Sequence, residues 1–424
     1  MTRVPVSLDG PSQLDGYRAI VGDGPVQTLE RLAKHLRGRR LVMVNSTSLG
    51  GGVAEILHRL VRLLNEAGIA TTWEVMPGHA RFYAVTKALH NALHGTPVKF
   101  TDEDREVFRE TNQHAASTLE LDGDLILIHD PQPAGLIDRR QPGQSWVWRC
   151  HIDLSHARVE AWDMIAPLVQ RYDAAVFSHA SFAPELGVPA MLVPSSIDPL
   201  SDKNRPLRED EEERLLEPLG IPDRHPWVTQ ISRFDRLKDP VGVVRAFELV
   251  ARHQRAQLIL AGGSADDDPE GAEVLAEVRE RVGKRTDVSV LELPPDAHLT
   301  INSIQARSTV LLQKSLREGF ALTVSEGLWK RRAVVASAVG GIPLQVQHER
   351  TGLLVRSIEG AAYQTTRLLH APALRRELGL HGHHHVRDNF LHTREARDYL
   401  ALFVWLASHS TGALSHPGVA SGPR

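Results

Sequence analysis

The sequence predicts an α/β protein of two domains, each with a parallel β-sheet between layers of helices. Short apolar runs alternate with segments of helical periodicity along almost the whole chain. Glycine-rich or polar turns follow several of these runs, as in strand–loop–helix units. A break at 195–199, followed by a charged stretch, separates two such series. The 424 residues are enough for two or three domains with cores of their own.

The charge and cysteine content narrow the class of protein. The chain has 49 Lys and Arg against 52 Asp and Glu, a net charge of −3, so no general attraction to nucleic acid or membranes is expected. The single cysteine, Cys150, excludes an intramolecular disulfide. No signal-peptide core is visible, and no apolar run approaches the ~20 residues of a membrane span. We expect a cytoplasmic protein; the oligomeric state stays open, with a homodimer as one option.

The first domain is expected to span residues 1–195. It opens with a strand at 41–44, a glycine loop at 50–52 and a helix at 53–64, a pattern that leaves backbone amides free near a ligand. A tight turn without a ligand explains this loop equally well. Further elements are expected as strands at 69–75, 124–130, 145–150, 174–177 and 190–194 and as helices at 82–94 and 104–119.

Polar residues follow two of these strands. His129, Asp130 and Gln132 come at the end of the strand at 124–130, and His151 follows the strand at 145–150. Ligands of open α/β sheets gather at the carboxyl ends of strands, so these residues are candidates for a site. The Asp-Gly-Asp run at 122–124 lies at the opposite end of its strand, and we therefore expect no metal there.

The second domain is expected to span residues 196–394. The charged stretch at 202–214 is expected to lie outside the core, and an Asp run at 266–268 to cap a helix rather than bind metal. A His-rich helix near 381–385 is interpreted as a solvated face. A helix at 395–407 returns to complete the first domain, and 408–424 is expected to be disordered. The expected strands are 227–231, 257–261, 288–293, 309–313, 334–337 and 352–355, and the helices 240–251, 270–281, 299–308 and 373–387.

Charged residues gather at two strand ends of this domain. Arg233 and Lys238 follow the strand at 227–231 and would suit a diphosphate, Arg as a fork and Lys as a point charge. A solvated basic loop would have the same spacing. Glu318 and Glu326 are separated by seven intervening residues around the start of a helix, whose free amides suit phosphate and hydroxyl groups.

These motifs resemble the retaining glycosyltransferases of family 4, and more narrowly the trehalose glycosyltransferring synthases. The resemblance covers about residues 41–406. The Glu-x7-Glu pair with Arg233 and Lys238 is typical of the large family, whereas the N-terminal and His151 motifs point to trehalose. The motifs are V-N-S-T-S-L-G-G-G-V-A-E-I-L at 44–57, V-T-K-A-L-H-N-A-L-H-G at 85–95, H-D-P-Q-P at 129–133, W-R-C-H-I-D-L-S at 148–155, S-R-F-D at 232–235, D-D-P-E-G at 267–271 and R-E-G-F-A-L-T-V-S-E at 317–326.

The resemblance implies a GT-B fold, in which two Rossmann-like domains face each other across a cleft. It implies that Arg233 and Lys238 bind the donor diphosphate and that Glu326 holds the nucleotide ribose. Glu318 would hold hydroxyls of the transferred glucose, together with the amides of Gly319, Phe320, Ala321 and Leu322. Ala321 departs from the family pattern, which often has glycine there, so a methyl group would stand close to the sugar.

The first domain would supply the remaining contacts. The resemblance places His151 near the donor glucose at the reacting face. Gly51 and Gly52 would approach the diphosphate or the acceptor, and Asp130 and Gln132 would bind the acceptor glucose. Catalytic roles would fall to His151, Arg233, Lys238 and Glu318.

The implied reaction is NDP-glucose plus glucose giving α,α-trehalose and NDP, reversibly and with retention at the anomeric carbon. UDP-glucose and ADP-glucose are both candidate donors, no metal or other cofactor is expected to be obligatory, and stimulation by Mg²⁺ stays open. Two other functions are compatible with the sequence. One is a retaining trehalose phosphorylase, which uses phosphate in place of the nucleotide; the other is a nucleotide-sugar-binding regulator without turnover.

Overall fold

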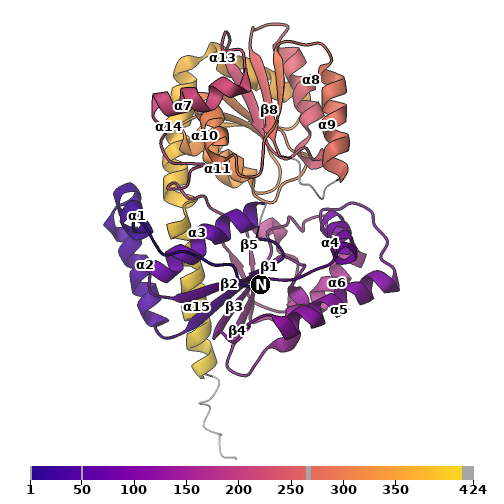
Figure 1. The fold of residues 1–424 in the computed structure, drawn as a ribbon, viewed down its shortest axis with the longest axis vertical. Helices are drawn as coiled ribbons and strands as arrows, with labels where there is room; N and C mark the ends of the chain where they lie inside the picture. Colours follow the sequence, from indigo (N-terminus) through magenta and orange to yellow (C-terminus); the bar gives the residue numbers. More distant parts are fainter. Residues whose placement is uncertain (1, 49–50, 264–268, 413–424) are drawn as a thin grey trace, which may run out of the picture.

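The computed structural model describes residues 2–48, 51–263 and 269–412. Two six-stranded sheets, both entirely parallel, form two α/β domains stacked one above the other (Figure 1). The strand orders are β2-β1-β3-β4-β5-β6 and β12-β11-β10-β7-β8-β9. The predicted fold class is thus confirmed, and parallel connections with helices on both faces explain why most strands read as continuous apolar runs.

The first sheet follows the predicted strands closely. All residues of β3, β4 and β5 are buried, because helices cover both faces of the sheet. The strands are β1 (Arg40–Asn45), β2 (Ala70–Val75), β3 (Leu125–His129), β4 (Ser145–Arg149), β5 (Ala174–Phe177) and β6 (Ala190–Leu192).

The second sheet repeats this arrangement. Its central strands β10 and β7 lie side by side, so their carboxyl ends meet at one edge of the sheet. The strands are β7 (Trp227–Ile231), β8 (Gln257–Gly262), β9 (Val288–Glu292), β10 (Val310–Gln313), β11 (Ala333–Ser337) and β12 (Leu353–Val355).

Several helices were missing from the sequence prediction. The N-terminal helices α1 and α2, the helix α6 and the helix α13 all occupy segments for which no element was predicted. The α-helices are α1 (Gln13–Val21), α2 (Asp23–His35), α3 (Gly52–Glu66), α4 (Ala80–Leu93), α5 (Asp102–Thr118), α6 (Val159–Val169), α7 (Glu209–Leu216), α8 (Pro240–Val250), α9 (Pro269–Val282), α10 (His298–Arg307), α11 (Leu322–Trp329), α12 (Ile342–Gln345), α13 (Ile358–His370), α14 (Pro372–Asn389) and α15 (His392–Gly412). No helix in these described ranges is long and apolar enough to cross a membrane.

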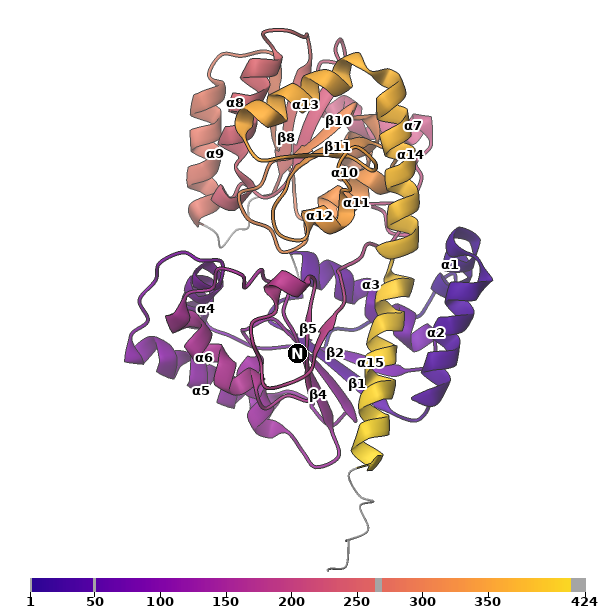
Figure 2. The same ribbon diagram turned by 180° about the vertical axis from the view of Figure 1, so that it is seen from behind.

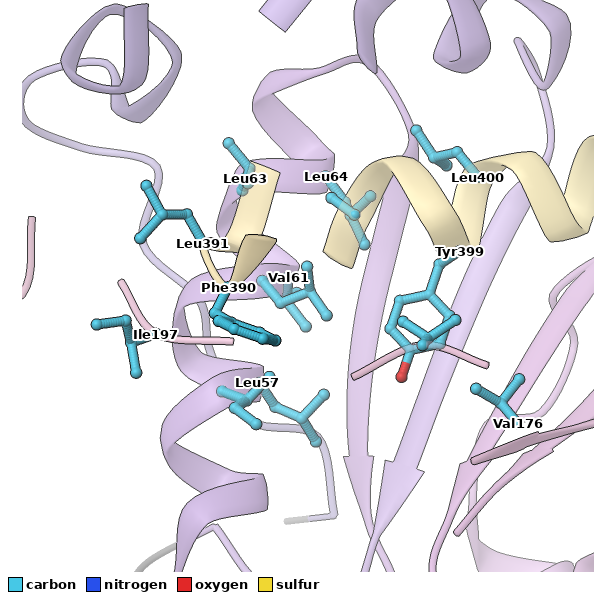
Figure 3. Close-up of a cluster of buried hydrophobic side chains, with 14 of the residues drawn as sticks. Leu57, Val61, Leu63, Leu64, Val176, Ile197, Phe390, Leu391, Tyr399 and Leu400 are labelled. Carbon is cyan, nitrogen blue, oxygen red and sulfur yellow. The ribbon is translucent and has the colours of Figure 1, made fainter. Parts of the chain in front are cut away.

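The C-terminal helix α15 leaves the second domain and packs on the first, as Figure 2 shows for the yellow end of the chain. Tyr399, Leu400 and Phe403 are fully buried in a cluster with residues of α2 and α3. In Figure 3, Tyr399 extends from this helix toward the strands of the first sheet, whereas Leu400 leaves the helix on its other side. The helix runs to Gly412, past residue 408, where the disordered tail was predicted to begin; residues 413–424 lie outside the described part.

Two predictions about polar segments need correction. Asn204 is only 3% exposed, so the charged stretch at 202–214 is not wholly outside the core. His383 stacks on Trp329 with a ring distance of 4.4 Å, and His385 Nε2 lies 2.8 Å from the Leu344 carbonyl oxygen. The His-rich face of α14 is therefore partly packed against the second domain. The Asp run at 266–268 lies outside the described residues.

Candidate active site

Glu318 is a buried carboxylate at the end of β10, just ahead of α11. Its Oε2 accepts a hydrogen bond from Lys238 Nζ at 2.7 Å. Its Oε1 accepts from Ser315 Oγ at 2.8 Å and from Gln313 Nε2 at 3.2 Å. With only 4% of the residue exposed, the carboxylate is fixed in one orientation. The structure thus brings together two predicted site residues, Lys238 and Glu318, from neighbouring strand ends.

Arg233 lies at the carboxyl end of β7, in the same loop region as Lys238. Its Nη2 lies 3.0 Å from Asp235 Oδ2, and its side chain is 47% exposed. Asp235 also accepts a hydrogen bond from the Leu237 amide at 2.7 Å, which shapes the turn between the two cations. An exposed guanidinium and a largely buried ammonium therefore stand on one short turn, and their charges would be compatible with a diphosphate.

The backbone from Gly319 to Leu322 forms the approach to α11. None of these four amides donates a hydrogen bond within the described part of the chain, so they are available to an anion or a hydroxyl. The Phe320 ring turns away from this approach and packs on Phe390, with ring centroids 5.5 Å apart. Phe320 can therefore serve the predicted donor site only through its main chain.

Ala321 adopts the left-handed conformation, with φ +70°. This conformation favours glycine and costs an L-residue about 1–2 kcal/mol. Glycine would therefore fit this backbone better than alanine, regardless of how close the methyl group comes to the sugar.

His151 belongs to a compact group at the carboxyl ends of β3 and β4. Its Nε2 lies 3.0 Å from His129 Nδ1, and the two rings stack with centroids 5.4 Å apart. The His151 amide donates to Asp130 Oδ1 at 2.8 Å, and Asp130 itself has a left-handed backbone with φ +67°. Trp148 Nε1 donates to the Asp130 carbonyl at 2.9 Å, which fixes that turn.

Burial and a buried cation set the protonation of this group. Burial, assisted by Arg149, lowers the pKa of His129 to about 3, and the same two causes together with His129 lower the pKa of His151 well below its ordinary value. Burial raises the pKa of Asp130 to about 6, against the opposing effect of the His151 amide and Arg149. The two imidazoles are therefore neutral at pH 7, so His151 can offer a hydrogen bond but no charge.

The predicted acceptor residues occupy different environments. The Asp130 carboxylate is committed in part to the His151 amide. The Gln132 carbonyl accepts from Asn112 Nδ2 at 3.0 Å, while its buried Oε1 accepts no hydrogen bond within the described residues. Such an unpartnered acceptor is compatible with a hydroxyl ligand. Arg149, two residues before His151, is fully buried, and its guanidinium donates hydrogen bonds to Ser178 Oγ and Ser195 Oγ.

The two domains touch at the candidate site. A Cβ on Gly319 would lie 2.2 Å from the His151 carbonyl oxygen, so only glycine permits this approach of the two main chains. A Cβ built at Gly52, the first residue of α3, would lie 3.1 Å from Leu322 Cδ1. Gly51 has φ +78° and open space around it. The described end of the first domain's glycine loop, Gly51 and Gly52, thus lies next to the start of α11 in the second domain. Residues 49–50 of this loop lie outside the described part.

Glu326 lies apart from Glu318. It is completely buried in α11, where its Oε2 accepts from Gln305 Nε2 at 2.8 Å and its Oε1 lies 3.0 Å from Lys203 Nζ. A ribose would reach this carboxylate only if a covering group moved. The structure therefore does not bring the two glutamates into one network.

The sequence prediction missed two histidines at the C-terminal end of α4. His90 and His94 stand one turn apart with ring centroids 4.7 Å apart. Burial lowers the pKa of His94 to about 4, and burial, His94 and the cations Lys87, Arg233 and Lys238 lower the pKa of His90. This end of α4 therefore faces the cations of the second domain. The His-x3-His spacing within the motif at 85–95 was the available signal, since it puts both rings on one helix face.

No group of three or more His, Cys, Asp or Glu side chains in the described ranges is arranged to hold a metal ion.

Comparison with known proteins identifies both halves of the chain. Residues 43–184 match the model of the N-terminal domain of trehalose synthase, and residues 211–384 match that of group 1 glycosyl transferases. The trehalose synthase of Pyrococcus horikoshii is 40% identical over 92% of this chain and 96% of its own length. That of Rubrobacter xylanophilus is 40% identical over 94% and 98%. The trehalose phosphorylase of Pleurotus pulmonarius is 29% identical over 80% of this chain but only 54% of its own.

Solved structures with similar folds agree with the two-domain architecture. An α,α-trehalose-phosphate synthase (UDP-forming) from Burkholderia xenovorans superposes with a TM-score of 0.70, at 16% identity over 87% of this chain and 100% of that chain. A sucrose-phosphate synthase from Thermosynechococcus elongatus has a TM-score of 0.65, at 19% identity over 89% and 100%. The fold is therefore GT-B, and the chain belongs to the trehalose synthase family, glycosyltransferases of trehalose metabolism.

Proposed function

We propose that this chain transfers glucose from an NDP-glucose to free glucose, giving α,α-trehalose and NDP, reversibly and with retention. The observation that carries the proposal is the unpartnered amide run from Gly319 to Leu322 beside the Lys238–Glu318 pair. Cations suit a diphosphate, and free amides beside a fixed carboxylate suit sugar hydroxyls, so this edge of the second sheet fits a nucleotide sugar. The names of the relatives support trehalose as the product.

A double-displacement mechanism is not supported by the carboxylates. It requires two carboxyl groups about 5–5.5 Å apart, one as nucleophile and one as acid/base. Glu318 is bound by Lys238 and Ser315, whereas Glu326 is buried by Gln305 and Lys203. Neither side chain is free to act as a nucleophile.

We therefore infer a reaction on one face of the donor. The bond from the glucose C1 to the phosphate oxygen breaks first, leaving a short-lived oxocarbenium–phosphate ion pair. The acceptor hydroxyl forms the new C1–O bond on the same face, and its proton goes to the departing phosphate oxygen. Arg233 and Lys238 would stabilise the charge on the leaving NDP, and neutral His151 would donate or accept one hydrogen bond to the glucose. Gln132 and Asp130 would bind the acceptor. No cofactor is obligatory in this scheme, and Mg²⁺ is at most a stimulant.

A donor screen tests the proposal. The protein is incubated with glucose and either UDP-glucose or ADP-glucose, with and without EDTA, and the products are followed by NMR. We expect α,α-trehalose from at least one donor, also in the presence of EDTA. If neither donor gives a disaccharide, the proposed reaction is wrong.

A trehalose phosphorylase is the second candidate, because relatives with that name match 80% or more of this chain. Inorganic phosphate could occupy the place of the donor diphosphate beside the same cations. In that case trehalose plus phosphate would yield glucose 1-phosphate, and the nucleotide sugars would give no trehalose. One NMR series with both sets of substrates separates the two functions.

A further inference from the structure

One ammonium group joins the two domains beneath the candidate site. Lys203 belongs to the segment that links the domains. Its Nζ lies 2.9 Å from Glu55 Oε2 on α3 and 3.0 Å from Glu326 Oε1 on α11. Figure 1 shows these two helices facing each other where the domains meet. Lys203 therefore links the buried carboxylate of the second domain to a helix of the first.

The chain around Lys203 is held firmly. Lys330 Nζ donates to the Lys203 carbonyl at 2.7 Å and to Asn204 Oδ1 at 3.0 Å. Trp329 Nε1 donates to the Asn204 carbonyl at 3.1 Å, and Asn302 Nδ2 donates to the Asp202 carbonyl at 2.8 Å. With a side chain only 13% exposed, Lys203 is a fixed part of the structure rather than a mobile surface lysine.

Two buried acceptors next to Lys203 can accept a further hydrogen bond. Within the described residues, Gln305 Oε1 accepts none, and Glu326 Oε1 is approached by the Lys203 ammonium at 3.0 Å. Gln305 is 1% exposed and Glu326 is not exposed at all. A buried acceptor without a donor is destabilising, so such atoms call for a ligand or an ordered water. Two adjacent acceptors suit a molecule with vicinal hydroxyls.

The charge of Lys203 also determines the state of Glu326. Burial by itself would raise the pKa of this carboxyl, but Lys203 and then Lys330 hold the pKa below its ordinary value. Burial likewise disfavours the Lys203 ammonium, yet Glu326 and Glu55 outweigh it and raise its pKa. Glu326 is consequently ionised at neutral pH and ready to accept from hydroxyls.

We propose that Lys203 and Gln305 are positioning residues for the nucleotide ribose, holding Glu326 so that it and Gln305 Oε1 accept the two ribose hydroxyls. This inference rests on the proposed function, since it assumes a nucleoside diphosphate as part of the donor. The covered carboxylate becomes accessible when its neighbours shift as the nucleotide enters. Through Glu55, the same ammonium connects the ribose position to the first domain.

A ligand pair tests the inference. Isothermal titration measures the Kd of UDP or ADP, whichever the wild type binds more tightly, and of its 2′,3′-dideoxy analogue. The wild type is expected to prefer the ribose form by at least about tenfold, because charged acceptors make strong hydrogen bonds. In Lys203→Met the preference should fall below about threefold. The matched control is Lys34→Met, which changes an exposed lysine. A second control is Glu55→Gln, which leaves the Lys203–Glu326 pair intact. Both controls should keep the wild-type preference.

The possible outcomes distinguish a failure of the ribose proposal from a failure of the proposed glucose transfer. If Lys203→Met weakens both ligands equally, its role is only structural and the inference is wrong. If the wild type does not distinguish the two ligands, the acceptors hold water and the inference also fails, while glucose transfer stands. If the wild type binds neither nucleotide, the proposed function itself fails. Circular dichroism checks the fold, and should Lys203→Met not fold, Gln305→Met is expected to lose the same preference.

Discussion

At the scale of single residues, the candidate site is controlled by burial rather than by exposed charge. His129 and His151 are held neutral by burial and by the cation of Arg149, while Asp130 is pushed toward its protonated form. Glu318 is oriented by three donors, and Glu326 by Gln305 and Lys203. A residue type in the sequence therefore says little about its role until its neighbours are known.

His129 makes the stability depend on pH. Its pKa is about 3 in the folded protein and about 6.5 in an unfolded chain, so the unfolded state binds more protons between these values. The His129 contribution is fully present above about pH 6.5 and is lost progressively as the pH falls toward 3. Between pH 6 and 4, the free energy of unfolding of His129→Gln should fall less steeply with pH than that of the wild type. The two slopes should differ by about 1.4 kcal/mol per pH unit.

Urea titrations at several pH values measure these slopes. Substitution of the exposed His253 by Gln is the control and should leave the slope unchanged. Equal slopes in His129→Gln and the wild type would show that His129 is already protonated, or accessible, in the folded protein.

At the scale of elements, strand ends and helix starts bring the functional groups together. The ends of β7 and β10 supply Lys238 and Glu318, and the ends of β3 and β4 supply Asp130 and His151. The helix α15 has a different task, because it packs a second-domain extension onto the first domain. Arg394 on this helix donates to the Pro194 carbonyl, which adds a polar link at the crossing.

Phe403 should report how much α15 stabilises the first domain. The side chain is completely buried, so Phe403→Ala should lower the free energy of unfolding by about 3–5 kcal/mol. Trp405 on the same helix is 40% exposed, and Trp405→Ala should cost less than about 1 kcal/mol. Urea unfolding followed by circular dichroism compares the two variants. A similar small loss in both would mean that α15 is not a stable part of the first domain.

At the scale of the whole molecule, the closeness of the two domains is set by small residues. Gly319 meets the His151 carbonyl, and Gly52 meets Leu322. Lys203 adds an ionic link between α3 and α11. Because a GT-B reaction would join a donor on one domain to an acceptor on the other, these contacts determine whether the reacting atoms come within reach.

Gly319→Ala should separate the domains at the site. The new Cβ would lie 2.2 Å from the His151 oxygen, so one main chain must withdraw. A displacement of about 1 Å can reduce turnover about 100-fold, and we expect a fall in kcat of that order with the Kd for NDP changed less than about threefold. Steady-state kinetics and titration measure the two quantities. Gly24→Ala, which meets no atom within 4 Å, is the control. Unchanged kcat in Gly319→Ala would rule out a role for this close contact.

The sequence by itself determined the fold class, most strands and many helices. The strand at 174–177 was predicted with the bounds that the structure gives β5, because a buried parallel strand is a continuous apolar run. The helices α1, α2, α6 and α13 were not predicted, because no clear loop or strand pattern flanks these segments in the sequence. The cations and glutamates of the second domain could be selected because they follow strand ends, where ligands bind in such sheets.

Only the tertiary structure decided which of those residues act together. Glu318 and Glu326 look alike in the sequence, yet one bonds Lys238 and the other is buried against Lys203 from the interdomain segment. Lys203 carries no local pattern that marks it, because its partners Glu55 and Glu326 lie on helices of the two different domains. Local periodicity fixes which residues form strands and helices, whereas burial and long-range ion pairs arise only once two domains have closed on each other.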